Sequence, residues 1–234
     1  MKTTKWQGVI LDLFDTVVVE DTRVFDRIVQ RAFHDAEHED GQPTIDEASK
    51  WILSQFTNEY SNDSSGEFKT EIEALRRVLT LASDHWAVQF DVDWSIDQII
   101  EDWSVPTFLP SAERFFEKVD LPICILSDAD NIYLKPALSH LGLSAIPVVS
   151  SEDCRAYKPA TTGFEKALSI LALDPSAVVH IGNSTGSDGA GAAAAGVDFI
   201  WINAQNAPLP PSSKAHPTAD VKSLSDAVSI VMNS

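Results

Sequence analysis

The sequence is poor in basic residues, and this scarcity excludes two classes of partner. Among 234 residues there are 17 Lys and Arg against 35 Asp and Glu, which gives a formal charge of −18. Non-specific binding to nucleic acid or to an anionic membrane surface requires basic patches, so we expect neither partner. The same charge repels an anionic substrate at long range, so a site for such a substrate must carry local positive charge.

Cysteines and long apolar runs are scarce as well. The two cysteines, Cys124 and Cys154, are too few for a disulfide framework or a thiolate metal site. No apolar run approaches the roughly 20 residues that span a bilayer. Residues 1–7 also lack the apolar segment of a secretion signal. We therefore expect a cytoplasmic protein.

The sequence does contain an alternation of short apolar runs with amphipathic segments. We expect strands at residues 8–14, 121–127, 146–150, 177–181 and 197–202, and helices at residues 111–119, 131–141, 161–171, 188–195 and 224–232. This alternation predicts an α/β fold in which helices cover a parallel sheet, formed by residues 1–17 and 104–234.

Residues 18–103 differ in character and are predicted to form an inserted domain of four helices. Thr22 and Thr44 are expected to cap the first two, with Glu47 at the capping-box position after Thr44. Residues 58–66 predict a polar turn, and apolar residues recur at helical spacing over residues 68–82. Ser95 is expected to cap the fourth helix. The chain is thus predicted to be an α/β core interrupted by a helical insertion.

Polar side chains stand at the ends of several predicted strands. Ligands of open α/β sheets bind beyond the carboxyl ends of the strands, so we expect these side chains to converge on one site. They are Asp12, Asp15, Ser127, Asp128, Asn183, Ser184 and Asp188, joined by Lys158 from a loop before a helix.

These residues form four motifs that follow one another along nearly the whole chain. The motifs are Asp12-Leu13-Phe14-Asp15-Thr16, Ser127 at the end of ICILS, Tyr157-Lys158-Pro159, and Gly182-Asn183-Ser184 with Asp188. In this pattern the sequence resembles the haloacid dehalogenase-like (HAD) superfamily of hydrolases. The resemblance implies the HAD fold, a Rossmann-like parallel sheet core with an inserted α-helical cap.

The resemblance also implies catalytic roles. Asp12 is then a carboxylate nucleophile that forms a covalent ester. Thr16 and Ser127 hydrogen-bond the nucleophile or the transferred group, and Lys158 offsets the negative charge around Asp12 and keeps it ionised. Asp188 is the acid of the fourth motif, which in phosphatases of this kind is a Mg²⁺ ligand.

Two positions depart from the phosphatase pattern. Phosphatases of the superfamily have a general acid two residues after the nucleophile, where this chain has Phe14, and a carboxylate where it has Asn183. An aromatic residue at the first position resembles the 2-haloacid dehalogenase branch, in which a halide leaves without a general acid. Our leading hypothesis is therefore a dehalogenase-type hydrolase that needs no cofactor.

Two alternatives stay open. The first is a Mg²⁺-dependent phosphatase of small phosphate esters, in which Asp12 and Asp188 bind the metal and Asp15 or Asp128 replaces the missing acid. The second is a HAD-fold binding protein without full activity. Against the dehalogenase branch stand Asp128, Phe164 and Thr185, where the branch has Asn, Tyr and Asn.

The substrate is expected to be a small anionic molecule, and the protein a monomer or homodimer. Arg23, Arg27 and Arg31 form one stripe at i, i+4 and i+8 of the first inserted helix. Arg23 or Arg27 is a candidate to hold the substrate carboxylate. Other candidate substrate-binding residues are Phe14, Asp128, Asn183 and Ser184.

Overall fold

The computed structural model describes residues 5–34, 43–61, 67–110 and 112–233. The chain divides into two compact units, each described by itself here. The sheet unit comprises residues 1–20, 106–131 and 138–234, and the helical unit comprises residues 21–105 and 132–137. No helix in the described parts of the chain is both long and apolar enough to span a bilayer.

The sheet unit contains a six-stranded parallel sheet with the order β3-β2-β1-β4-β5-β6, which confirms the predicted fold class. The strands are β1 (Gly8–Leu11), β2 (Ile123–Ser127), β3 (Val148–Ser150), β4 (Val178–Gly182), β5 (Asp198–Ile202) and β6 (Pro217–Val221). Strand β6 was not predicted, because its residues alternate between half-buried and exposed and include a proline and an aspartate instead of an apolar run.

The register of the central strands brings the predicted site residues together. β1 lies between β2 and β4, with Leu11 opposite both Ile125 and Ile181. Because all strands are parallel, their carboxyl ends share one edge of the sheet. Asp12, Asp128 and Asn183 directly follow β1, β2 and β4 at that edge.

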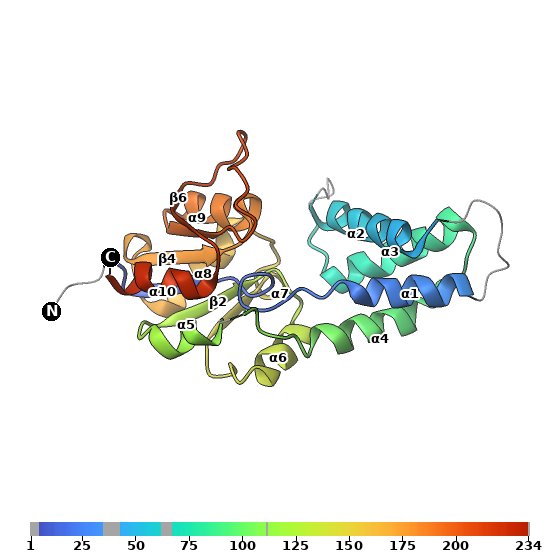
Figure 1. Ribbon diagram of the computed structural model, residues 1–234, viewed down its shortest axis with the longest axis horizontal. Coiled ribbons are helices and arrows are strands. Elements are labelled where there is room, and N and C mark those ends of the chain that lie inside the picture. The colour runs from blue at the N-terminus through green and yellow to red at the C-terminus, as the bar shows by residue number, and fades with distance from the viewer. Residues whose placement is uncertain (1–4, 35–42, 62–66, 111, 234) are drawn as a thin grey trace. The chain divides into compact units, whose positions relative to one another are not determined.

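Helices pack on this sheet, as Figure 1 shows. Those in or ending in the sheet unit are α5 (Glu113–Lys118), α6 (Asn131–His140), α7 (Ser151–Cys154), α8 (Thr161–Leu171), α9 (Ala190–Ala195) and α10 (Leu224–Asn233). A π-helical turn, Thr185–Gly189, precedes α9. Close packing of α9 against α8 requires glycine at position 191, since a Cβ at Gly191 would lie 2.4 Å from the Phe164 ring. Cys124 and Cys154 are both free thiols.

The helical unit contains α1 (Arg23–His34), α2 (Ile45–Ser61), α3 (Glu71–Trp86) and α4 (Val92–Trp103). The predicted capping box at Thr44 is present, since its hydroxyl accepts from the Glu47 N–H and its own N–H donates to the Glu47 carboxylate.

Two predictions in this unit were wrong. Ser95 does not cap α4, because it lies inside the helix and the cap is Asp91, whose carboxylate accepts from the Trp94 N–H. The polar stretch at residues 58–66 does not begin as a turn, because α2 continues to Ser61. Residues 62–66 lie outside the described residues.

Candidate active site

Asp12 lies one residue beyond the end of β1. Its N–H donates to the Ile181 carbonyl at 3.0 Å, which continues the sheet pairing and directs the residue to the edge of the sheet. Both carboxylate oxygens are engaged. Oδ1 accepts from Lys158 Nζ at 2.7 Å, and Oδ2 accepts from the Thr16 hydroxyl at 2.7 Å. The predicted nucleophile is therefore held in one orientation by two donors.

Lys158 is buried between two carboxylates. Its Nζ donates to Asp12 Oδ1 at 2.7 Å and to Asp188 Oδ1 at 2.6 Å. Burial opposes the charge, but Asp12, Asp188 and Asp128 hold the pKa of Lys158 well above its usual value. The site thus contains a permanent cation that both carboxylates share.

Asp188 is fixed by contacts on both of its oxygens. Oδ1 accepts from Lys158, and His180 Nε2 lies 3.0 Å from the same oxygen. Oδ2 accepts from the Ser184 N–H at 2.9 Å. Burial favours the neutral acid, yet Lys158 and His180 outweigh it and hold the pKa of Asp188 below its usual value. Asp188 is therefore the anionic anchor of the lysine.

Asp12 differs from Asp188 in its proton affinity. Burial raises the pKa of Asp12 above its usual value, with a further contribution from Asp188, while Lys158 and Thr16 oppose the rise. A carboxylate with a raised pKa retains more electron density for attack on carbon, and the lysine keeps it ionised.

Ser127 and Asp128 end β2 and begin the next loop. Asp128 Oδ1 accepts from the backbone N–H of Lys158 at 2.8 Å. Burial raises the pKa of Asp128 to about 6, against the attraction of Lys158. Ser127 is buried, and its hydroxyl accepts from the Ala129 N–H at 3.4 Å. Among the described residues no hydrogen bond joins Ser127 to Asp12.

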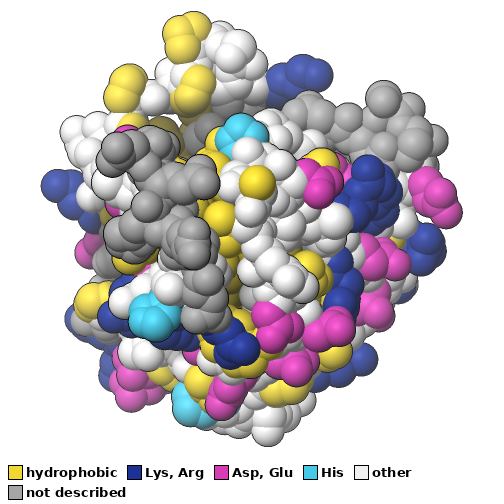
Figure 2. Space-filling model, turned by 90° about the vertical axis from the view of Figure 1, so that its right-hand side faces the viewer, with side chains coloured by type: hydrophobic (Ala, Val, Ile, Leu, Met, Phe, Trp, Pro, Cys, Tyr) yellow, Lys and Arg dark blue, Asp and Glu magenta, His cyan; other side chains and the backbone are white. Residues whose placement is uncertain are grey.

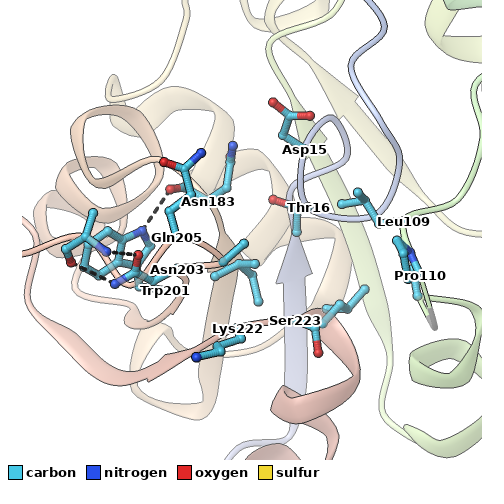
Figure 3. A pocket seen from close by; sticks show the side chains of 15 residues that line it. Asp15, Thr16, Leu109, Pro110, Asn183, Trp201, Asn203, Gln205, Lys222 and Ser223 are labelled. Atoms are coloured by element: carbon cyan, nitrogen blue, oxygen red, sulfur yellow. Dashed lines mark hydrogen bonds between the residues drawn. The ribbon is translucent and has the colours of Figure 1, made fainter.

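A cavity of about 650 Å³ lies in the sheet unit next to this network. Figure 3 shows Thr16 at the end of β1, Asn183 and Trp201 on one wall and Leu109 and Pro110 on the other. The Trp201 indole donates to the Asn183 carbonyl at 2.9 Å and fixes that wall. Thr16 lines the cavity and also donates to Asp12. The cavity is therefore separated from the predicted nucleophile by the Thr16 side chain.

Phe14 is half-buried in the loop that carries Thr16. Asp15, the next residue, has φ 56°, and its carboxylate accepts from the Glu20 N–H at 3.0 Å. The loop thus turns sharply after Asp12, and it carries Phe14 two residues beyond this carboxylate.

Arg23 and Arg27 lie in the helical unit, where each pairs with a neighbouring acid. Arg23 binds Asp21 at 2.5 Å, and Arg27 binds Asp102 at 2.6 Å. Basic and acidic side chains also stand next to each other on the face that Figure 2 presents. Both guanidinium groups therefore have carboxylate partners within the helical unit.

Three residues near the site were not predicted from the sequence. His180 lies within the apolar run of β4, which gives no sign in the sequence that it contacts Asp188. Lys222 is the only Lys or Arg among the described residues that line the cavity. Glu20 is exposed beside the loop that follows β1, and its N–H donates to the Asp15 carboxylate. None of the three belongs to a recognisable motif, so no local pattern pointed to them.

The donor set fits Mg²⁺ poorly. The ammonium of Lys158 lies between the two carboxylates that a metal would share, and Asp188 has both oxygens occupied. In the described part of the chain, no cluster of three or more His, Cys, Asp or Glu could hold a metal ion. Mg²⁺ prefers several hard oxygen ligands, and Lys158 already neutralises part of the charge of the two carboxylates that would supply them.

Comparisons with known proteins identify the family and the fold of the chain. The model of the haloacid dehalogenase-like hydrolase family matches residues 6–196. Similar folds include an L-2-haloacid dehalogenase from Xanthobacter autotrophicus with chloropropionic acid covalently bound (16% identity, covering 97% of this chain and 98% of that chain, TM-score 0.77). Another is a 2-haloacid dehalogenase from Pseudomonas syringae pv. Tomato (22% identity, 97% and 98% covered, TM-score 0.68).

A third similar fold belongs to YfnB, a magnesium-bound HAD-hydrolase from Bacillus subtilis (17% identity, 97% and 99% covered, TM-score 0.75). A search of curated proteins gives no match. At these identities the solved structures establish the fold alone.

Proposed function

Because the chain belongs to the haloacid dehalogenase-like hydrolase family, we propose that it is a hydrolase of the 2-haloacid dehalogenase type. The observation that carries the proposal is the position of Lys158, whose ammonium contacts Asp12 and Asp188 at 2.7 and 2.6 Å. This arrangement supplies the cation of the site from the chain itself. It supports a reaction that needs no metal and, with Phe14 at the acid position, no general acid.

In the first step, a carboxylate oxygen of Asp12 attacks C2 of a 2-haloacid. A new C–O bond forms, and the carbon–halogen bond breaks with both of its electrons leaving on the halide. A halide is a stable anion and needs no proton to leave, which agrees with an aromatic side chain at Phe14. Thr16 and Lys158 hold the attacking carboxylate during this step.

In the second step, water attacks the carbonyl carbon of the Asp12 ester. The bond between that carbon and the ester oxygen breaks, the 2-hydroxy acid is released, and one proton passes to solvent. Lys158 is placed to stabilise the negative charge that develops on the attacked carboxyl group. The overall balance is one 2-haloacid and one water in, and one 2-hydroxy acid, one halide and one proton out.

The carboxylate of the substrate requires a positive partner. Arg23 and Arg27 remain the candidates from the helical unit, where Arg27 pairs with Asp102. Lys222 is a candidate within the sheet unit, because it lines the cavity beside Thr16. Ser127, Ser184 and Asn183 complete the proposed binding residues around the nucleophile.

We further propose that residues 18–103, which include most of the helical unit, act as a cap domain on a core of residues 1–17 and 104–234, and that the protein is a cytoplasmic monomer or homodimer. The two free cysteines, one of them fully buried, suit a reducing compartment.

A phosphatase remains the second candidate because of one observation. The pKa of Asp128 is raised to about 6, so this carboxyl group can carry a proton near neutral pH and replace the acid that Phe14 lacks. This function requires Mg²⁺ to bind Asp12 and Asp188 beside Lys158.

Paired assays separate the two functions. Halide release from 2-chloropropionate in EDTA is expected for the dehalogenase, with no increase on addition of Mg²⁺. Hydrolysis of p-nitrophenyl phosphate that requires Mg²⁺ and exceeds halide release overturns the proposal in favour of the phosphatase.

Asp12→Asn is the variant that tests the nucleophile. The amide preserves the shape of the side chain but cannot form the ester, so halide release is expected to fall by several orders of magnitude. The matched control is Asp15→Asn, which makes the same change at an exposed carboxylate of the same loop. Near-normal turnover of Asp12→Asn contradicts the mechanism.

A further inference from the structure

His180 lies in the middle of β4 and is fully buried. The Phe164 ring meets it edge-on at 5.0 Å between centroids, and the Phe199 ring stacks on it at 6.0 Å. An imidazole in such apolar surroundings is costly unless both of its nitrogens have hydrogen-bond partners. The polar partners of this ring therefore indicate why a histidine stands in an apolar strand.

Both ring nitrogens of His180 have an acceptor within reach, and the tautomer with its proton on Nε2 donates to Asp188. Nδ1 lies 3.1 Å from the Ile10 carbonyl oxygen, and Nε2 lies 3.0 Å from Asp188 Oδ1. Ile10 is the direct neighbour of His180 in the pairing of β1 with β4. The ring thus joins Asp188 to the strand that carries the nucleophile, two residues before Asp12.

These contacts close a loop of polar groups. From Asp12 the chain of contacts passes to Lys158, then to Asp188, then to His180, and returns to β1 at Ile10. Every link is shorter than 3.2 Å. The position of Lys158 on the nucleophile therefore depends on how Asp188 is held.

Asp188 is held by His180 on one side and by backbone on the other. A Cβ at Gly182 would lie 2.4 Å from Asp188 Cγ, so the carboxyl group rests directly against the backbone of β4. The Ser184 N–H fixes Oδ2. With that side closed, His180 Nε2 and Lys158 Nζ together define where Oδ1 points.

We propose that His180 is a positioning residue that directs Asp188 Oδ1 toward Lys158 and thereby keeps the ammonium on Asp12. The proposal rests on the function proposed above, because it assigns His180 a part in orienting that nucleophile. If the role of His180 is purely structural, replacing it by another ring is expected to be tolerated, since a ring of similar shape can fill the space between Phe164 and Phe199.

Three substitutions at this position separate the two roles. His180→Phe preserves a ring but removes both nitrogens. His180→Gln provides an amide N–H that reaches toward Asp188. His180→Asn has a shorter amide, which reaches the Ile10 carbonyl but not Asp188. Phe199→Leu is the packing control, because it disturbs the same aromatic cluster without removing a hydrogen bond.

The first readout is kinetic. His180→Phe and His180→Asn are expected to lower kcat for halide release from 2-chloropropionate by about 10- to 100-fold, because a misplaced catalytic group costs rates of this order. KM is expected to change less than about twofold, since His180 does not contact substrate. His180→Gln is expected to regain most of the lost kcat, and Phe199→Leu to keep kcat within about threefold of the parent.

The second readout does not depend on activity. A proton–nitrogen correlation spectrum detects a buried, hydrogen-bonded lysine ammonium, and Lys158→Met identifies its signal by loss. The Lys158 signal is expected to shift or broaden in His180→Phe, to return in His180→Gln, and to persist in Phe199→Leu.

The outcomes are distinguishable. An unchanged Lys158 signal in His180→Phe, or equal defects in His180→Phe and His180→Gln that follow their losses of stability in urea, overturns the positioning role. If the parent protein releases no halide, the proposed function fails, and the spectrum alone still decides whether His180 holds the network.

Discussion

Lysine and arginine meet carboxylates in both units of the molecule, at similar distances but in different surroundings. In the sheet unit, Lys158 Nζ lies 2.7 Å from Asp12, with side chains that are 4% and 8% exposed. In the helical unit, Arg27 lies 2.6 Å from Asp102, with side chains that are 47% and 27% exposed. The distances of the two contacts are nearly the same, so the two ion pairs differ mainly in how far solvent reaches them.

This difference separates a reactive site from a solvated surface. Around Lys158, burial moves the pKa of Asp12 up while the lysine keeps Asp188 ionised, so two carboxylates of one site acquire different proton affinities. Around the arginines, water screens the charges, and such pairs contribute little to stability. Charge alone therefore does not distinguish Lys158 from the arginines, whereas charge combined with burial does.

Removal of Lys158 is expected to have the largest effect. Lys158→Met leaves Asp12 and Asp188 buried without their shared cation, which costs about 3–5 kcal/mol of unfolding free energy and at least about 100-fold in halide release. Urea unfolding and initial rates measure the two effects. The matched control is Lys166→Met, whose parent lysine is exposed and donates to the Asp153 carbonyl. Equal effects of the two substitutions contradict the distinction drawn here.

Asp128→Asn is expected to have an intermediate effect that depends on pH. The pKa of Asp128 is raised from its usual value of 3.8 to about 6 in the folded protein. The protonated carboxyl group therefore makes its full contribution to the unfolding free energy below pH 3.8, and this contribution is lost as the pH rises through about 6. At pH 8 the amide, which still accepts from the Lys158 N–H, is expected to increase the unfolding free energy by about 1–2 kcal/mol. Urea titrations from pH 4 to pH 8 measure the difference. A gain that is independent of pH contradicts this assignment.

Substitutions with smaller expected effects identify the cation that binds the substrate carboxylate. Arg27→Gln and Lys222→Gln each leave kcat nearly unchanged, and the one that contacts substrate raises KM for 2-chloropropionate about 5- to 10-fold, because a solvated charge contact contributes about 1 kcal/mol. Lys214→Gln, a surface lysine outside the cavity lining, serves as the control. If neither substitution raises KM, both candidates are wrong.

The smallest effect is expected for the stability of the exposed pairs. Arg31 lies 3.2 Å from Asp91 and 4.0 Å from the centroid of the Trp94 ring. Arg31→Gln is expected to reduce the unfolding free energy by less than about 1 kcal/mol, and added salt is expected to reduce the difference further. A loss as large as that of Lys158→Met contradicts the comparison between buried and exposed pairs.

Much of this architecture could be predicted from the sequence because it depends on local patterns. The apolar run before Asp12 predicts β1, and parallel strands place their following residues at one edge, which correctly places Asp12 and Asn183 at the ends of adjacent strands. The capping box at Thr44 also depends only on neighbouring residues.

The remaining features depend on contacts between distant segments. His180 looks like a strand residue in the sequence, and its partner Ile10 lies 170 positions away. The cap of α4 was misassigned because Asp91 and Ser95 are both acceptable capping residues, and only the backbone decides between them. Lys222 lies in no motif, and only the fold brings it to the cavity that Thr16 lines.

The central claim is that Asp12, held by Lys158, forms a covalent ester with the substrate. The most direct test is a single turnover with 2-chloropropionate in water labelled with heavy oxygen, in EDTA, followed by mass spectrometry of the peptide that contains Asp12. One oxygen of the label is expected in the Asp12 carboxyl group, and none is expected in the lactate of the first turnover. Label found only in lactate, with an unlabelled Asp12 peptide, contradicts the claim, because water then attacks the substrate directly.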